Sequence, residues 1–459
     1  MSTLSQISSR VPPKGCPFHK IMAQAGSDPD MMETVKDTIS RHQDNPMEAL
    51  TLLHQKFGRA FQVETGQGSV RFDHHPETAR KLLMNTEGED PDFRKSTIQT
   101  HGLASALGNE NVLIASGSDW HSSREALTDF FNAKNMKTDG KIQSMSGVLD
   151  KHLDKVESSL DNTGQTQVDL SKLFRKATLD VALNTLFSVQ PNEAELDTLS
   201  KSYEVLNKNV GREWLLPAEI TGVDTPGQEY EKALASIDGW ATKLVEERQR
   251  QPEQPDDALK ALMGATDPDT GRPYDQKRLV SEVKNLMLAG HETTANLLTW
   301  TMTEIARNPI IQAQMKSEIQ AACGQSVPTA QEMKSLGSIF QCWREQATEH
   351  PPNFLIAREA VKDTSVGPTD SPVPIKAGTT VMVSTQHANL DTDGAMFSFG
   401  GGKRFCLGIN MARQETELAV TRFLQRFDVS DSGERGVVSG LTQTPEDTLV
   451  QVSRRTKKS

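Results

Sequence analysis

The chain has 459 residues, of which 36% are hydrophobic and 24% charged, as is typical of a globular protein with a large core rather than of a disordered chain. Its formal net charge of -11 argues against a general affinity for nucleic acid. Because the chain has no apolar run long enough to span a bilayer and no apolar signal segment, we expect a cytoplasmic protein without a membrane anchor.

Most of the chain shows the spacing of apolar residues by three and four that predicts amphipathic helices. In chain order, the expected helices cover residues 145–160, 166–188, 227–250, 277–307, 310–323 and 331–349. Strand signals are fewer and shorter, at residues 61–63 with 69–72, 381–384 and 449–452. The sequence therefore predicts a mainly α protein with a small β component. We expect one large domain over residues 1–459, with an N-terminal extension of about residues 1–45.

The predicted helix at residues 277–307 is apolar on nearly all faces, which indicates that it runs through the core. Within it, residues 289–294 read AGHETT. A buried acid and threonine in mid-helix carry a desolvation cost. A threonine hydroxyl that bonds back to the helix, next to Gly290, favours a local bulge and a pocket for a small ligand. A polar stripe that faces another element explains the segment equally well.

A glycine-rich segment, FSFGGGKRFCLG, covers residues 397–408. Its consecutive glycines allow positive φ angles and close approach to a flat group. An amphipathic pattern follows, so Cys406 is expected at a helix N-terminus, where the dipole and free amides stabilise a thiolate. A thiolate is the haem ligand that favours cleavage of the O–O bond. Cys16, Cys323 and Cys342 have settings compatible with ordinary packing or exposure.

This glycine-rich segment resembles the cysteine-ligand loop of the cytochrome P450 family. The motif positions are filled by Phe399, Gly402, Arg404, Cys406 and Gly408. The resemblance extends from about residue 50 to the C-terminus. It implies the cytochrome P450 fold and a haem b (iron protoporphyrin IX) whose iron is bound by Cys406.

The AGHETT segment is similar to the distal-helix motif of the same family. This resemblance implies that Ala289 and Gly290 flank the haem, that Thr293 hydrogen-bonds the activated oxygen, and that Glu292 helps to relay protons. Haem propionates need cationic or hydrogen-bonding partners when they are buried. The family pattern supplies four candidates here, which are Trp120, Arg124, Arg358 and Arg404. By the same resemblance, the apolar residues Phe354, Leu355 and Ile356 line the substrate pocket.

The sequence departs from the family in two places. Where the family has Glu-x-x-Arg before a Pro-Pro pair, this chain has Glu345-Gln-Ala-Thr348. The segment between His387 and Phe397 is also short, so the meander that normally precedes the cysteine loop is largely absent. We expect Glu345 to be buried and to be compensated by His387, Arg344 or a neighbouring hydroxyl.

The resemblance implies a haem-thiolate monooxygenase that uses dioxygen to hydroxylate, epoxidise or otherwise oxidise a small hydrophobic molecule, such as an intermediate of secondary metabolism. External redox partners, a ferredoxin and its reductase or an equivalent, are implied because the chain has no flavin or iron–sulfur motif. Basic residues such as Lys403 and Arg413 are candidates for the docking face. Two alternatives stay open: an enzyme for oxidative coupling, cyclisation or dehydrogenation, and a degenerate haem-binding protein without turnover.

Overall fold

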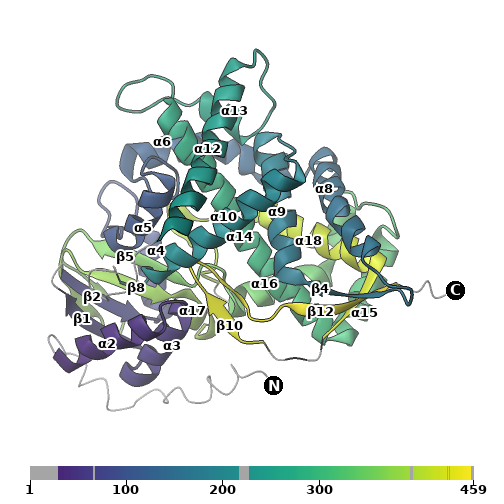
Figure 1. The fold of residues 1–459 in the computed structure, drawn as a ribbon. Helices are drawn as coiled ribbons and strands as arrows, with labels where there is room; N and C mark the ends of the chain where they lie inside the picture. The colour runs from purple at the N-terminus through teal and green to yellow at the C-terminus, as the bar shows by residue number, and fades with distance from the viewer. Residues whose placement is uncertain are drawn as a thin grey trace.

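Helices make up most of the computed structural model, which describes residues 29–65, 68–216, 227–392, 396–431, 433 and 435–455. The largest sheet lies at one end, beside the first two helices, and the longest helix passes through the middle of the helical part (Figure 1). The helices are α2 (Pro29–Arg41), α3 (Pro46–Phe57), α4 (Pro76–Met84), α5 (Thr97–Leu107), α6 (Gly117–Phe131), α7 (Ala133–Met136), α8 (Asp139–Ser158), α9 (Leu170–Phe187), α10 (Glu193–Arg212), α12 (Gln228–Arg250), α13 (Ala258–Met263), α14 (Gln276–Arg307), α15 (Pro309–Ala322), α16 (Gly337–Glu349), α17 (Thr385–Leu390) and α18 (Ile409–Arg426), with the 3-10 turns η2 (Glu332–Ser335) and η3 (Gly402–Arg404).

All six helices expected from periodicity are confirmed, with two corrections. Residues 166–169 belong to a strand, and α9 begins only at Leu170. Asp169 is the N-cap of this helix, because its side chain accepts a hydrogen bond from the backbone N–H of Lys172. Residues 332–335 form the turn η2, so α16 begins at Gly337. The predicted strands are also confirmed, because each lies within β1, β2, β8 or β12.

Four sheets are present within the described residues. The five-stranded sheet has the order β1-β2-β8-β5-β3, and β2 pairs in parallel with β8 while the other neighbours are antiparallel. The other sheets are β4-β12-β9, β10-β11 and β6-β7. The strands are β1 (Ala60–Thr65), β2 (Gly68–Asp73), β3 (Phe93–Lys95), β4 (Gln165–Asp169), β5 (Leu355–Ala360), β6 (Thr364–Val366), β7 (Val373–Ile375), β8 (Thr380–Ser384), β9 (Phe427–Ser430), β10 (Val437–Ser439), β11 (Gln443–Pro445) and β12 (Leu449–Arg454).

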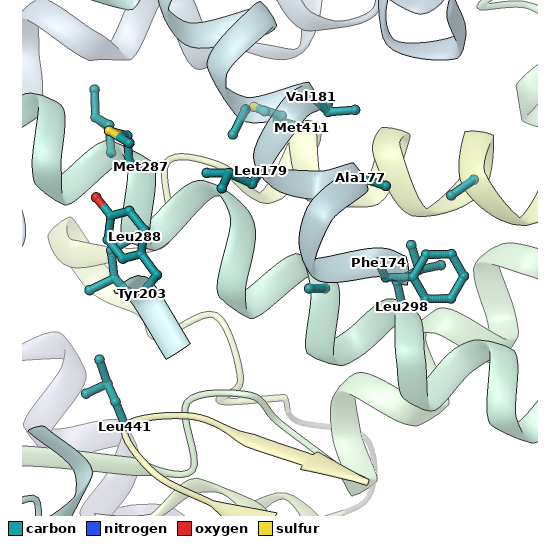
Figure 2. Close-up of a cluster of buried hydrophobic side chains, with 14 of the residues drawn as sticks. Phe174, Ala177, Leu179, Val181, Tyr203, Met287, Leu288, Leu298, Met411 and Leu441 are labelled. Carbon is teal, nitrogen blue, oxygen red and sulfur yellow. The ribbon is translucent and has the colours of Figure 1, made fainter. Parts of the chain in front are cut away.

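The core surrounds α14, which is buried on nearly all sides, as its sequence predicts. Figure 2 shows side chains of α9, α14 and α18 together in this core. Helix α9 packs especially close, since a Cβ on Gly290 would lie 3.2 Å from Leu186 Cδ1 and 3.5 Å from Ala182 Cβ. Helix α14 is continuous from Gln276 to Arg307. The expected bulge is therefore wrong, and Gly290 provides room for α9 instead.

The N-terminal helix α2 contributes Val35 and Ile39 to the same hydrophobic core. Within the described ranges, the helices are all too short or too polar to cross a bilayer. Cys16 lies outside the described residues. The other three cysteines are free thiols, with Cys342 buried and Cys323 and Cys406 half-buried.

Candidate functional site

In the middle of α14, a short stretch of one face of the helix is not covered by other side chains and is accessible to a ligand. Between Ser281 and Thr303, every residue of the helix is buried except Ala289, Gly290 and Thr293. These three lie within one turn of the helix, and the Thr293 hydroxyl donates to the carbonyl of Ala289 at 3.0 Å. A small ligand can therefore reach a mainly apolar surface with one hydroxyl group on it.

Glu292 lies on the other side of α14 and is buried. Its Oε1 accepts a hydrogen bond from Asn207 Nδ2 of α10 at 3.1 Å and lies 3.9 Å from Arg175 Nε of α9. Burial by itself raises the pKa of Glu292, but Arg175, the adjacent His291 and Asn296 lower it, and the net pKa lies below the usual value. The carboxylate is therefore ionised at neutral pH, although it lies in the core.

Side chains around Glu292 lead in two directions, to Glu204 at the surface and to Thr442 between β10 and β11. Arg175 Nη1 lies 3.3 Å from Oε1 of Glu204, an exposed residue. In the other direction, Asn207 Nδ2 donates to Thr442 Oγ1 at 2.6 Å, and Asn296 Nδ2 donates to the same oxygen at 2.9 Å. Sequence reasoning missed these partners. Only Asn296 carried a signal, because it lies four residues after Glu292 and so on the same helical face.

Cys406 lies just before the N-terminus of α18, as its sequence predicts. The backbone amides of Gly408 and Ile409, at the start of this helix, lie next to its sulfur. Burial raises the pKa of the thiol, and although these amides and the nearby Arg124 lower it, the net pKa lies above the usual value. The free thiol is thus protonated at neutral pH, and a bound metal ion would be needed to hold it as a thiolate.

Two glycines of the cysteine loop have the positive φ angles that the sequence predicts, and one of them also packs against α4. Gly400 and Gly402 have φ angles of 73° and 58°, a region that favours glycine. A Cβ on Gly402 would lie 2.5 Å from the carbonyl oxygen of Leu83. Gly402 therefore also lets the loop lie close to the C-terminal end of α4. Phe399 stacks on Trp343 of α16, with ring centroids 5.3 Å apart.

Two arginines, Arg404 in the cysteine loop and Arg124 on α6, hold backbone carbonyls near Cys406 by hydrogen bonds. Arg404 forms a buried ion pair with Glu87, donates to the carbonyl of Ala115 at 2.6 Å, and lies over the ring of Trp120 at 4.5 Å. Its Nη1 atom is buried and has no hydrogen-bond partner among the described residues. Arg124 Nη1 donates to the carbonyl of Phe405 at 2.7 Å, and burial lowers its pKa.

Two more cations lie near Arg404. Arg358 is buried on β5 and faces Lys95 of β3 in the sheet register. Burial and the charge of Arg404 lower the pKa of Arg358 to about 10. Burial, Arg358 and Arg404 also lower the pKa of Lys95 well below its usual value. Glu87 is the carboxylate that opposes both effects, so positive charge is in excess here.

This excess fits a group with buried carboxylates, as haem has. Among the described residues, Arg358, Arg404 and Lys95 lie near the carboxylate of Glu87, Arg124 lies near Arg404, and Nη1 of Arg404 is buried without a partner. Like charges in such a place are unfavourable unless an anion joins them. Three of these cations were expected from the sequence, whereas Lys95 was missed because only the register of β3 against β5 places it beside Arg358.

We expect Lys95→Met to have opposite effects on the two forms of the protein. Without haem, the change removes repulsion from Arg358 and Arg404, so the thermal midpoint should rise by a few degrees. With haem, a propionate loses one cationic partner, and haem affinity should fall about tenfold. Thermal melts of both forms and transfer of haem to apomyoglobin measure the two effects. A fall of both melting temperatures would contradict the assignment of Lys95 to this cluster.

The three apolar residues expected at the substrate pocket do not share one face. Phe354 and Leu355 are buried in the main core, whereas Ile356 belongs to a second cluster with residues of α4 and β8. Successive residues of a strand point to opposite faces. Leu355 and Ile356 therefore cannot line one pocket together.

The expected compensation of a buried Glu345 is wrong, because Glu345 is exposed. It accepts a hydrogen bond from Gln341 Nε2 at 2.9 Å, one turn earlier on α16. Water solvates an exposed carboxylate, so no cationic partner is required. His387 instead bonds to Ser384 Oγ at 2.7 Å.

Comparison with known proteins agrees with this geometry. Residues 35–394 and 387–453 match the model of the family described as Cytochrome P450. The chain belongs to the cytochrome P450 family. It is therefore a cytochrome P450 monooxygenase with the P450 fold, and the family requires haem iron, dioxygen, a substrate and a source of electrons. The two matched segments overlap at residues 387–394, within the segment between His387 and Phe397.

Several curated P450s are similar over most of their length. Cyclooctat-9-en-7-ol 5-monooxygenase of Streptomyces melanosporofaciens is 24% identical over 399 residues, which cover 81% of this chain and 82% of that protein. Pentalenene oxygenase of Streptomyces avermitilis is 23% identical, with 87% and 91% covered. Cytokinin hydroxylase of Arabidopsis thaliana is 23% identical, with 82% and 77% covered.

Proposed function

We propose that this P450 binds haem b through Cys406 Sγ and transfers an oxygen atom from dioxygen to a small hydrophobic substrate. The observation that carries the proposal is the position of Cys406, whose sulfur lies next to the backbone amides of Gly408 and Ile409 just before α18 and close to Arg124. These amides favour the thiolate. Bound haem would supply the oxygen-activating chemistry, and the protein would supply the ligand, the charges and the protons.

The other site residues have distinct roles in this proposal. Arg358, Arg404, Arg124 and Lys95 neutralise the propionates, and Trp120 packs under Arg404. The remaining residues shape the cavity and the loop, namely Ala289 and Gly290 on the accessible face of α14, and Phe399, Gly402 and Gly408 in the cysteine loop.

Protons would reach the site through Glu292 and Thr293. Glu292 is an ionised, buried proton acceptor one residue before Thr293, and Arg175 and the exposed Glu204 lie between it and the surface. Thr293 presents its hydroxyl on the accessible face, where it can release the carbonyl of Ala289 and donate to a ligand. This ionised buried carboxylate favours a catalytic protein over a purely haem-binding one, because burying it is otherwise unfavourable.

The accessible face of α14 and the names of two relatives support a mainly hydrocarbon substrate. Ala289 provides apolar contact there, and the names of two relatives refer to oxidation of cyclooctat-9-en-7-ol and pentalenene. We therefore propose a cyclic compound of secondary metabolism. Phe354 and Leu355 remain candidates for pocket residues, whereas Ile356 faces the second core cluster.

We further propose that electrons come from external redox partners in the cytoplasm. The exposed Lys403, together with Arg413 of α18, would contribute to a docking face. The three described cysteines are free thiols, which agrees with a reducing compartment. The proposal includes no nucleic-acid or membrane partner.

The test is the carbon monoxide spectrum of the reduced protein, with Cys406→Ser as the variant. We expect the red-shifted Soret band of a thiolate complex in the parent protein and its loss in Cys406→Ser, with turnover reduced at least about 1,000-fold because the ligand is removed. Cys323→Ser makes the same chemical change at another half-buried thiol and should alter neither the Soret band nor the turnover. A thiolate band that survives in Cys406→Ser would exclude Cys406 as the ligand.

The type of reaction needs a second measurement. With surrogate redox partners and a panel of cyclic hydrocarbons, products formed under ¹⁸O-labelled dioxygen are analysed by mass spectrometry. Hydroxylation or epoxidation incorporates one labelled atom, whereas coupling, cyclisation or dehydrogenation leaves the product unlabelled.

A further inference from the structure

The cysteine loop begins at a hydrogen-bonded junction that none of the roles above includes. Asn389 lies at the end of the short helix α17 and is buried. Its Nδ2 donates to the carbonyl of Thr348 at 3.0 Å and to Ser398 Oγ at 2.9 Å. Its Oδ1 accepts from the backbone N–H of Phe397 at 2.7 Å. Ser398 Oγ in turn donates to the carbonyl of Ala347.

These bonds connect the loop to the C-terminal end of α16. The last carbonyls of a helix have no partner within the helix, and two of them, on Ala347 and Thr348, accept from Ser398 and Asn389. Thr348 is the residue that stands where the family pattern has an arginine. The side chain of Asn389 uses both of its donor hydrogens and its acceptor oxygen in this junction.

The element that carries Asn389 is itself fixed. The backbone N–H of Thr385, at the start of α17, donates to the carbonyl of Phe354 at 2.9 Å, and its hydroxyl donates to the carbonyl of Asn353 at 2.7 Å. Because α17 is held in this way, the hydrogen bond from Phe397 N–H to Asn389 Oδ1 fixes the position of Phe397. From there the loop continues through a bond from Cys406 N–H to the carbonyl of Phe399 at 2.9 Å.

We propose that Asn389, with Ser398, is a positioning residue for Cys406. The amide anchors the start of the loop to α16, so that the sulfur stays directed at the bound iron instead of moving away when the ligand bond loosens. This inference rests on the proposed role of Cys406 as the iron ligand. It extends that role by naming what holds the ligand loop in a chain without the usual arginine.

The decisive variant is Asn389→Asp, which keeps the size and the acceptor oxygen of the side chain. A carboxylate cannot donate to the Thr348 carbonyl or to Ser398, so two of the three bonds are lost. In the reduced carbon monoxide complex, we expect conversion from the red-shifted thiolate band to the blue-shifted band of a displaced cysteine to be about tenfold faster. Ser398→Ala removes one shared hydroxyl and should accelerate the conversion about threefold.

The matched control is Gln312→Ala. Gln312 is also a buried amide that bonds to backbone atoms, because it donates to the carbonyl of Val429 at 2.7 Å and accepts from its N–H at 3.2 Å. It joins α15 to β9. We expect Gln312→Ala to lower the thermal midpoint and to leave the conversion rate within twofold of the parent.

The outcomes separate this inference from the proposed function. A parent protein without the thiolate band would overturn the role of Cys406. A parent with that band, and junction variants that convert no faster than Gln312→Ala at equal loss of thermal stability, would overturn the positioning role alone. If Asn389→Asp does not fold, Ser398→Ala decides the question by the same comparison.

Discussion

Replacing Glu292 by Gln is expected to lower the turnover number of this P450 by about 100-fold, because a positioned acid or base contributes at least that factor to proton transfer. The change keeps the size of the side chain and its acceptor for Asn207, but it removes the charge that faces Arg175. Proton delivery to Thr293 would then lack this ionised carboxylate. Product formation should fall more than consumption of reducing equivalents.

The measurement is the turnover number, together with product formed per NADPH consumed, in H₂O and in D₂O. A larger solvent isotope effect in Glu292→Gln would show that proton delivery limits the reaction. Glu282→Gln is the matched control, since Glu282 is a second buried glutamate ten residues earlier on α14, where burial raises its pKa to about 7. Turnover of Glu292→Gln within twofold of the parent would exclude the proposed role.

A fall of pH below 6.5 is expected to destabilise the fold strongly, through a buried group of histidines. The rings of His54 on α3, His74 after β2 and His387 on α17 lie together, with centroids 4.5 to 5.6 Å apart. Burial lowers the pKa of His54 to about 4, and burial and the charge of His54 lower the pKa of His387 to about 3. Burial and both neighbouring rings lower the pKa of His74 as well.

The direction of the effect depends on whether the folded or the unfolded protein binds more protons at a given pH. These folded-state pKa values lie below the ordinary value of 6.5, so below pH 6.5 the unfolded chain binds more protons than the folded one. Stability is therefore full above pH 6.5 and falls as the pH decreases towards 4. His54 alone accounts for roughly 3 kcal/mol over this window, because its pKa is about 4 in the folded protein instead of the ordinary 6.5. Asp73, His75, Arg59 and Asp391 are the charged or titratable groups around the cluster.

The test is urea unfolding, monitored by far-UV circular dichroism, at several pH values between 4.5 and 7.5. His74→Leu should make the stability of the protein less dependent on pH, because Nδ1 of His74 is buried without a hydrogen-bond partner among the described residues. The control is His101→Gln, which replaces an exposed histidine and should leave the dependence unchanged. An equally steep pH dependence in His74→Leu and the parent would rule out this cluster as the cause.

The sequence by itself determined the fold class, most of the core helices and the family. Each of these depends on short-range patterns: the apolar spacing of residues 277–307 predicts α14, and the glycines followed by an amphipathic run predict that Cys406 lies before a helix. Such patterns are visible because secondary structure has a fixed period. Arg358 and Arg404 lie near one another, as expected if both bind the haem propionates in the way that the family pattern implies.

Only the tertiary structure decided which side chains meet across long separations. Lys95 joins Arg358 through the register of β3 and β5, and Asn207 reaches Glu292 from α10. Glu345 was expected in a buried network, but it is exposed, while Asn389 makes the buried contacts of the neighbouring loop. Sheet register and helix packing set these pairs, and neither leaves a periodic or local mark in the sequence. The ligand loop was thus readable from the chain, whereas its supports depended on packing between distant segments.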